Sequence, residues 1–322
     1  MKRLNVCTVM ILLAIVIDAA CSKEKPAKEH FIGIDGISFE NYPKVDGSTS
    51  SYVLNMMVAC KQLSVPYKWS GADTFIEWSI HPVYDKIPKE RWPFFSEKIK
   101  SSKTHTAFLN LINGNADIII TSSTASPEEK AYAEAAGIIL TETPIASDAF
   151  VFVLNKNNPV KSLTADQIRK IYTGEIINWS QIGGKNAAIK VFTRPRNSGS
   201  EEVFRSLVMD GMEPADFPES AIGGMAGVFT EVRNFENAIC YTFNNYKNLQ
   251  ARVPDSEVPK IAIDNIFPSE KTIANGTYPF ITKLYVIIRS DLDHNTMAYK
   301  LYEWLQSQHA KPTIAECGFL PD

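Results

Sequence analysis

The sequence is poor in cysteine and lacks a long apolar run. Only 5 of its 322 residues are cysteine, and the longest uncharged apolar stretch is Val6–Ile17. That stretch is too short for a membrane-spanning helix, which needs about 20 residues. Lysine and arginine are scattered without a basic block, and the formal net charge is −3. The sequence therefore offers no nucleic-acid-binding surface, and its 45% hydrophobic content argues against disorder.

Common signatures of catalysis and metal binding are also missing. The five histidines are scattered without a His-x-x-x-His pair, and no serine lies in a Gly-x-Ser-x-Gly elbow. Cys60, Cys240 and Cys317 are too far apart in the sequence for a metal site or a disulfide framework. One pair of them could still form a disulfide in an oxidising compartment. We expect no metal, no cofactor and no enzymatic activity.

The N-terminus has the layout of an export signal. Two basic residues precede the apolar stretch, and small residues lead from it into Cys21. This pattern predicts a signal peptide over residues 1–20 and lipidation of Cys21 after cleavage. Asp18 departs from the usual lipoprotein pattern, so an ordinary signal peptide with an incidental Cys21 is the alternative. In both cases the protein leaves the cytoplasm, with residues 21–30 as a polar tether.

From residue 31 onward, apolar strand-like segments alternate with helical ones. Ser126–Glu129 is a capping box before a helix that Gly137 ends, and Thr164 begins another helix that Gly174 ends. A last amphipathic helix is expected over residues 297–308. The alternation predicts an α/β fold with largely parallel sheets. The expected strands are Ala116–Ile120, Ala149–Leu154, Ile189–Phe192, Lys260–Ile263 and Leu284–Ile288.

Three segments of small hydroxyl residues lead into helical patterns. They are Ser48–Ser51, Ser101–Thr104 and Ser198–Ser200. The start of a helix presents unpaired N–H groups and a partial positive charge, so it can bind an anion. Each segment alone is more simply interpreted as an N-cap. The third has an arginine, Arg194, four residues before Ser198, so a guanidinium and a helix start can converge on one oxyanion.

Several of these motifs together resemble one family. Tyr42–Ser50 resembles the opening of the PstS-type phosphate-binding proteins, the solute receptors of phosphate ABC importers. Leu163–Ile168 and Tyr172–Gly184 are similar to the family's most recognisable region. Arg194–Ser200 is similar to its Arg-x-x-x-Ser-Gly-Ser/Thr anion loop. The likeness continues along the chain and covers most of residues 40–290.

The resemblance implies an α/β type II periplasmic-binding-protein fold. In that fold two lobes, joined by a two-strand hinge, close on a ligand. The chain is long enough for two such lobes. Lobe 1 would comprise residues 31–150 and 265–322, and lobe 2 residues 151–264. The expected strands Ala149–Leu154 and Leu284–Ile288 would cross between the lobes.

The resemblance also implies which residues hold the ligand. Arg194 would pair with the bound oxyanion. Ser198, Gly199 and Ser200 would donate hydrogen bonds to it, as would either Thr104 or Ser102. Further donors would come from Ser48, Thr49 and Ser50, and the resemblance does not say which of these three contacts the ligand.

One departure from the family concerns the segment Thr121–Ser123. Many phosphate receptors place a carboxylate there, which accepts a hydrogen bond from protonated phosphate. This chain has no acidic residue in the segment, so the basis for choosing phosphate over sulfate is weaker. Asp46 could take that role, although a turn residue before Gly47 is the simpler interpretation.

The leading hypothesis is an extracytoplasmic solute-binding protein that captures inorganic phosphate and delivers it to ABC permease subunits. We expect a monomer, either anchored to the membrane through lipid on Cys21 or free in the periplasm. The alternatives are a receptor for sulfate or another tetrahedral oxyanion, and a signalling or adhesion lipoprotein that reuses the fold. A secreted phosphatase has the least support.

Overall fold

The computed structural model describes residues 31–71, 77–196, 198–217 and 224–322. The expected signal peptide, the tether and Cys21 lie outside the described residues. Within these ranges, no helix combines the length and the apolar character needed to cross a membrane.

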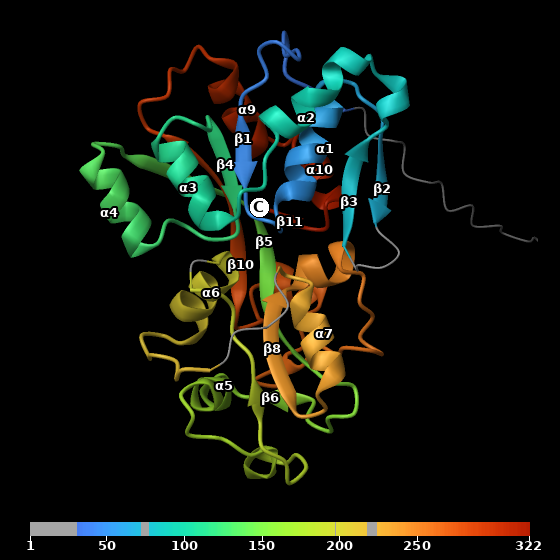
Figure 1. Cartoon of the computed structure of the whole chain (residues 1–322), viewed down its shortest axis with the longest axis vertical. Helices are drawn as coiled ribbons and strands as arrows, with labels where there is room; N and C mark the ends of the chain where they lie inside the picture. Colours follow the sequence, from blue (N-terminus) through green and yellow to red (C-terminus); the bar gives the residue numbers. More distant parts are fainter. Residues whose placement is uncertain (1–30, 72–76, 197, 218–223) are drawn as a thin grey trace, which may run out of the picture. The chain divides into compact units, whose positions relative to one another are not determined.

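A seven-stranded sheet runs through the described ranges (Figure 1). The strands are β1 (Val45–Gly47), β2 (Tyr67–Gly71), β3 (Trp78–Pro82), β4 (Ile118–Thr121), β5 (Leu140–Leu154), β6 (Ser162–Leu163), β7 (Lys190–Val191), β8 (Ala238–Phe243), β9 (Ala262–Ile263), β10 (Ile281–Arg289) and β11 (Leu320–Pro321). The main order is β1–β4–β10–β5–β8–β7, and β11 pairs with β5. Two small sheets pair β2 with β3 and β6 with β9.

The main sheet is mixed, so the prediction of largely parallel sheets was wrong. Only the outer pairs β1–β4 and β7–β8 are parallel in it, whereas the central pairs β4–β10, β10–β5 and β5–β8 are antiparallel. The reason is that β10, which comes late in the chain, inserts between β4 and β5. Strand–helix alternation indicates crossovers between strands that are close in sequence, and it gives no information about such a late insertion.

Helices flank the sheet, and several begin where the sequence predicts. The α-helices of the described residues are α1 (Tyr52–Gln62), α2 (Trp92–Lys98), α3 (Thr104–Ile112), α4 (Pro127–Ala135), α5 (Ala165–Tyr172), α6 (Gly199–Val203), α7 (Gly227–Asn234), α8 (Glu270–Ala274), α9 (Met297–Gln306) and α10 (Lys311–Glu316). Capping boxes begin α4 at Ser126 and α5 at Thr164, as predicted. Gly137 and Gly174 have positive φ angles just beyond these two helices, which is the usual role of glycine there.

The alternation of side chains along β4 explains why helices cover both faces of this part of the sheet. Ile118 and Ile120 point into one buried cluster, which also contains residues of α1, α9 and α10. Ile119, between them, points into a different cluster with Phe108 and Leu111 of α3. A strand whose two faces are both covered needs apolar residues on both of them, and β4 has isoleucine at its first three positions before it ends at the buried Thr121.

Strands β5 and β10 pass through two separate hydrophobic cores. One large buried cluster takes its residues from 149–280, and the other from 42–146 and 284–319. On β5 the change of core falls between Ala146 and Ala149, and on β10 it falls between Ile281 and Leu284. The two strands run side by side there (Figure 1). This is the two-strand connection expected of a hinge.

Candidate functional site

The segment after β1 is packed tightly against the end of β4. Because β1 and β4 are parallel, both strands end at the same edge of the sheet. Gly47 lies so close to the backbone of β4 that a Cβ atom there would collide with the carbonyl oxygen of Ile120. The hydroxyl of Ser51 also donates a 2.5 Å hydrogen bond to that oxygen. Glycine at position 47 therefore brings the following hydroxyl residues up to the edge of the sheet.

These hydroxyl residues form a connected cluster. The Ser48 and Ser50 hydroxyls are 3.0 Å apart, and Ser50 in turn hydrogen-bonds Ser122, after β4, at 2.9 Å. Thr49 is half-buried and lines a cavity of about 320 Å³, as does Ser122. Among the three candidates of this loop, Thr49 is the one on the cavity wall.

Two helix starts meet at the same cavity. Thr104 is the first residue of α3, and Gly199 is the first residue of α6; both line the cavity. A Cβ atom on Gly199 would collide with the hydroxyl oxygen of Thr104, so the two helices approach as closely as glycine allows. The structure therefore brings together two of the three expected helix starts, although they are almost a hundred residues apart in sequence.

Arg194 follows β7 and is 7% exposed. Its backbone N–H donates to the Tyr241 hydroxyl at 3.1 Å and, more weakly, to Glu201 at 3.4 Å. Arg194 also lines the cavity. Its guanidinium makes no hydrogen bond or ion pair with any residue in the described part of the chain. A buried charge without a partner is costly, so this guanidinium is suited to an anionic ligand.

The loop after Arg194 ends at the start of α6. Asn197 lies outside the described residues. Ser198 is the N-cap of α6, and its hydroxyl accepts a hydrogen bond from the N–H of Glu201 at 3.3 Å. Helix α6 therefore begins inside the predicted segment Ser198–Ser200, and it continues as a π-helical turn over Phe204–Val208. Ser198, Gly199 and Ser200 all line the cavity.

Charged residues near the cavity are distributed unevenly. Its described lining includes Lys103 and His105 beside Arg194, and it includes no aspartate or glutamate. Asp46 has a structural role: its carboxylate accepts hydrogen bonds from the N–H groups of Gly47 and Ser102, at 2.7 and 2.9 Å, and from the Asn110 amide. The N–H of Ser102 is therefore committed to Asp46.

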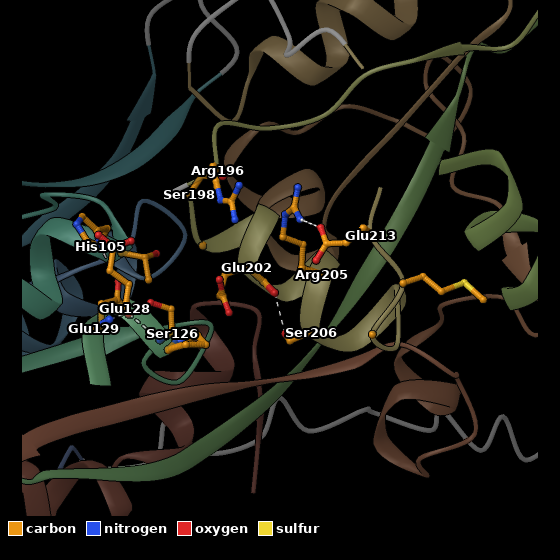
Figure 2. A pocket seen from close by; sticks show the side chains of 15 residues that line it. His105, Ser126, Glu128, Glu129, Arg196, Ser198, Glu202, Arg205, Ser206 and Glu213 are labelled. Atoms are coloured by element: carbon orange, nitrogen blue, oxygen red, sulfur yellow. Dashed lines mark hydrogen bonds and ion pairs between the residues drawn. The ribbon is translucent and has the colours of Figure 1, made fainter. Parts of the chain in front are cut away.

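A second cavity, of about 480 Å³, adjoins the first and shares Thr104, His105, Ser198 and Gly199 with it. In Figure 2, Glu202 has His105 and Glu129 on one side. On its other side lies the ion pair of Arg205 with Glu213. His105 contacts Glu129 at 3.0 Å. Burial, and then the charge of Glu129, raises the pKa of the Glu202 carboxyl. The acidic groups thus belong to this neighbouring cavity.

Sequence reasoning missed Lys103 and Ser122. Lys103 carries no signal of its own, because the pattern of its segment is set by the hydroxyl residues on both sides of it. Ser122 follows a buried strand, and the sequence drew attention to this segment only because it lacks an acidic residue. Its position in the cavity depends on the pairing of β1 with β4.

The buried cysteines do not suggest a reactive site. Cys60, Cys240 and Cys317 are buried and unpaired, and burial raises the pKa of the Cys60 and Cys240 thiols to about 12. Thiols that stay protonated at neutral pH are poor nucleophiles. Over the described ranges, no group of three or more His, Cys, Asp or Glu side chains is placed to hold a metal ion.

Comparison with known proteins gives a family match. The sequence model of the PBP superfamily domain matches residues 89–309. The phosphate-binding protein PstS of Bacillus subtilis is 26% identical over 210 residues, which are 65% of this chain and 63% of that protein. PstS of Staphylococcus haemolyticus is 26% identical over 71% of this chain and 72% of that protein. The resemblance to PstS-type proteins is confirmed.

Solved structures give the same fold. A phosphate ABC transporter substrate-binding protein of Clostridium perfringens, with bound phosphate, superposes with a TM-score of 0.61 at 23% identity. It covers 86% of this chain and 98% of its own. An ABC-type phosphate transport receptor of Vibrio cholerae gives a TM-score of 0.60, also at 23% identity and with the same coverage. The expected type II periplasmic-binding-protein fold is confirmed.

Proposed function

Since the chain belongs to the PBP superfamily, we propose that it is an extracytoplasmic solute-binding protein that captures inorganic phosphate for an ABC importer. The observation that carries this proposal is the buried guanidinium of Arg194, which lines a cavity with hydroxyl groups and two helix starts. Arginine and N–H groups at helix starts bind tetrahedral oxyanions. The relatives named for phosphate binding support inorganic phosphate as the anion. Capture and release of an anion require no covalent step, so we propose no enzymatic activity.

Sulfate is the second candidate ligand. The described lining of the cavity contains no carboxylate, so nothing in it repels a fully deprotonated anion. The unfolding experiment described next is therefore carried out with sulfate as well as with phosphate.

Thermal unfolding with and without phosphate tests the proposal. The purified chain, freed of bound anion, should unfold several degrees higher in 1 mM phosphate, because a ligand of micromolar affinity stabilises by about 4 kcal/mol at that excess. Arg194→Ala should bind phosphate at least about 30-fold more weakly, since truncating one partner of a buried charge pair costs about 2 kcal/mol or more.

Arg196→Ala is the matched control, because Arg196 is exposed and lines only the neighbouring cavity. We expect this variant to shift with phosphate as the wild type does. A phosphate response that survives in Arg194→Ala would contradict the assigned site. The absence of a response to phosphate in the wild type would contradict the function.

Three finer proposals rest on the sequence and the family. We propose that Cys21 carries a lipid anchor, that the chain acts as a monomer, and that it delivers its anion to permease subunits. The lobes, expected as residues 31–150 with 265–322 and as 151–264, are likewise proposed. Labelled fatty acid should be incorporated into the wild type and not into Cys21→Ser. Incorporation into both would contradict lipidation at Cys21. Sedimentation as a dimer would contradict the monomer.

A further inference from the structure

Lys103 lines the oxyanion cavity directly before α3. We propose that Lys103 contacts the bound anion, gives the cavity a second positive charge, and thereby fits it to doubly charged tetrahedral anions, sulfate as well as phosphate. This inference rests on the proposed function, because it concerns the same cavity and the same class of ligand. It adds a residue that neither the motifs nor the order of the elements pointed to.

The backbone of Lys103 is the first observation behind the proposal. Its φ of 70° and ψ of 162° lie in a region that is essentially restricted to glycine. The neighbouring contacts hold it there: the N–H of Ser102 donates to the buried Asp46, and the carbonyl of Lys103 accepts from Ala107 at 2.9 Å. Glycine would adopt this conformation without strain. A lysine in place of glycine at such a position, on the wall of a binding cavity, therefore indicates that its side chain has a role in binding.

The charges around Lys103 are the second observation. Lys103 is exposed, and in the described ranges neither an ion pair nor a side-chain hydrogen bond commits its ammonium group to another residue. Within the described lining, Arg194 is the other cation without an acidic partner. His105 also lines the cavity, but its ring is paired with Glu129 at 3.0 Å. Two uncompensated positive charges and no carboxylate in the described lining match an anion of charge −2.

Three substitutions separate the charge of Lys103 from its backbone strain. Lys103→Gln removes the charge and keeps a side chain on the strained backbone, Lys103→Arg keeps both, and Lys103→Gly removes both. Lys100→Gln is the matched control, because Lys100 is exposed three residues earlier and is not part of the cavity wall. The measurement is isothermal titration of the full chain with phosphate and with sulfate.

We expect the wild type to bind both anions. Lys103→Gln and Lys103→Gly should bind each about tenfold more weakly, which corresponds to about 1.4 kcal/mol, whereas Lys103→Arg and Lys100→Gln should stay close to the wild type. Unchanged affinity in Lys103→Gln, or a loss confined to Lys103→Gly, would overturn the role of the charge. A wild type that binds phosphate alone would overturn the selection by charge, and a wild type that binds neither anion would contradict the proposed function itself.

Discussion

Asp148 is a buried carboxyl group at the point where β5 passes from one hydrophobic core to the other. It is 6% exposed, and it accepts hydrogen bonds from the backbone N–H of Asn245 at 3.1 and 3.3 Å. Burial raises its pKa to about 7, against the opposing effects of backbone hydrogen bonds from Ala149 and Asn245 and the charge of Lys260. The fold therefore opposes the ionised form of this residue.

This pKa predicts a pH-dependent stability. Because the folded-state pKa lies above the ordinary value of 3.8, the contribution of Asp148 to the unfolding free energy is fully present below about pH 4 and is lost as the pH rises through about 7. Between pH 5 and pH 8 the wild type should lose about 3 kcal/mol relative to Asp148→Asn, because the loss runs at about 1.4 kcal/mol per pH unit and levels off above pH 7. Urea unfolding at several pH values measures the difference.

Glu270→Gln is the control for this prediction, because Glu270 is an exposed carboxyl that lines the same cavity as Asp148. Its stability profile should run parallel to that of the wild type. If Asp148→Asn also runs parallel to the wild type, Asp148 does not titrate in this range.

The residues of the site differ in how far the sequence predicts them. Arg194 and Ser198–Ser200 are adjacent in one motif, so local spacing places them at one helix start, and the structure has them on one cavity wall. Lys103, in the site, and Asp148, outside it, carry no local signal. The strained backbone of Lys103 and the burial of Asp148 depend on contacts with segments that are distant in sequence.

At the scale of elements, the contact between α3 and α6 fixes the geometry of the site. A methyl group on Gly199 would collide with the hydroxyl oxygen of Thr104, which is backed by the buried start of α3. Gly199→Ala should lower the unfolding free energy of the anion-free protein by about 1–3 kcal/mol, the usual cost of overpacking. Urea unfolding measures the loss.

A double-mutant cycle makes this prediction specific. Thr104→Ala removes the colliding oxygen, so adding it to Gly199→Ala should recover most of the lost stability, while Thr104→Ala alone serves as the reference. Additive effects of the two substitutions would show that α3 and α6 do not meet as described.

The ends of helices are more predictable than the directions of strands. Ser126 and Thr164 cap helices through side chains three residues away, so the sequence contains both partners of each capping box. The direction of β10 relative to β4 and β5 depends on how a strand near the C-terminus inserts between them. No local pattern contains that information.

At the scale of the whole molecule, the described part of residues 31–322 contains two main cores and polar contacts between them. The amide of Gln250 donates to the Ser50 carbonyl at 2.9 Å, and the amide of Asn245 donates to the Cys317 carbonyl at 2.8 Å. The Arg252 guanidinium lies 3.8 Å from the centre of the Trp78 ring. Contacts of this kind are weaker than a continuous hydrophobic core, so they can break while each core stays intact.

The boundary between the cores follows contacts that the sequence did not reveal. Ile273, Tyr278 and Phe280 pack with the cluster formed by residues 149–280, although the family resemblance assigned residues from 265 onward to the other lobe. On this segment the change of core falls between Phe280 and Leu284. The lobe boundary at residue 265 stays a proposal, because the packing of this segment is not contained in sequence similarity.

Equilibrium dialysis of the full-length chain against labelled phosphate tests the central claim most directly. The proposed function predicts one phosphate per chain with a dissociation constant in the micromolar range or below, and loss of that binding in Arg194→Ala. A chain that binds no phosphate at 1 mM, after removal of any carried-over anion, would contradict the account.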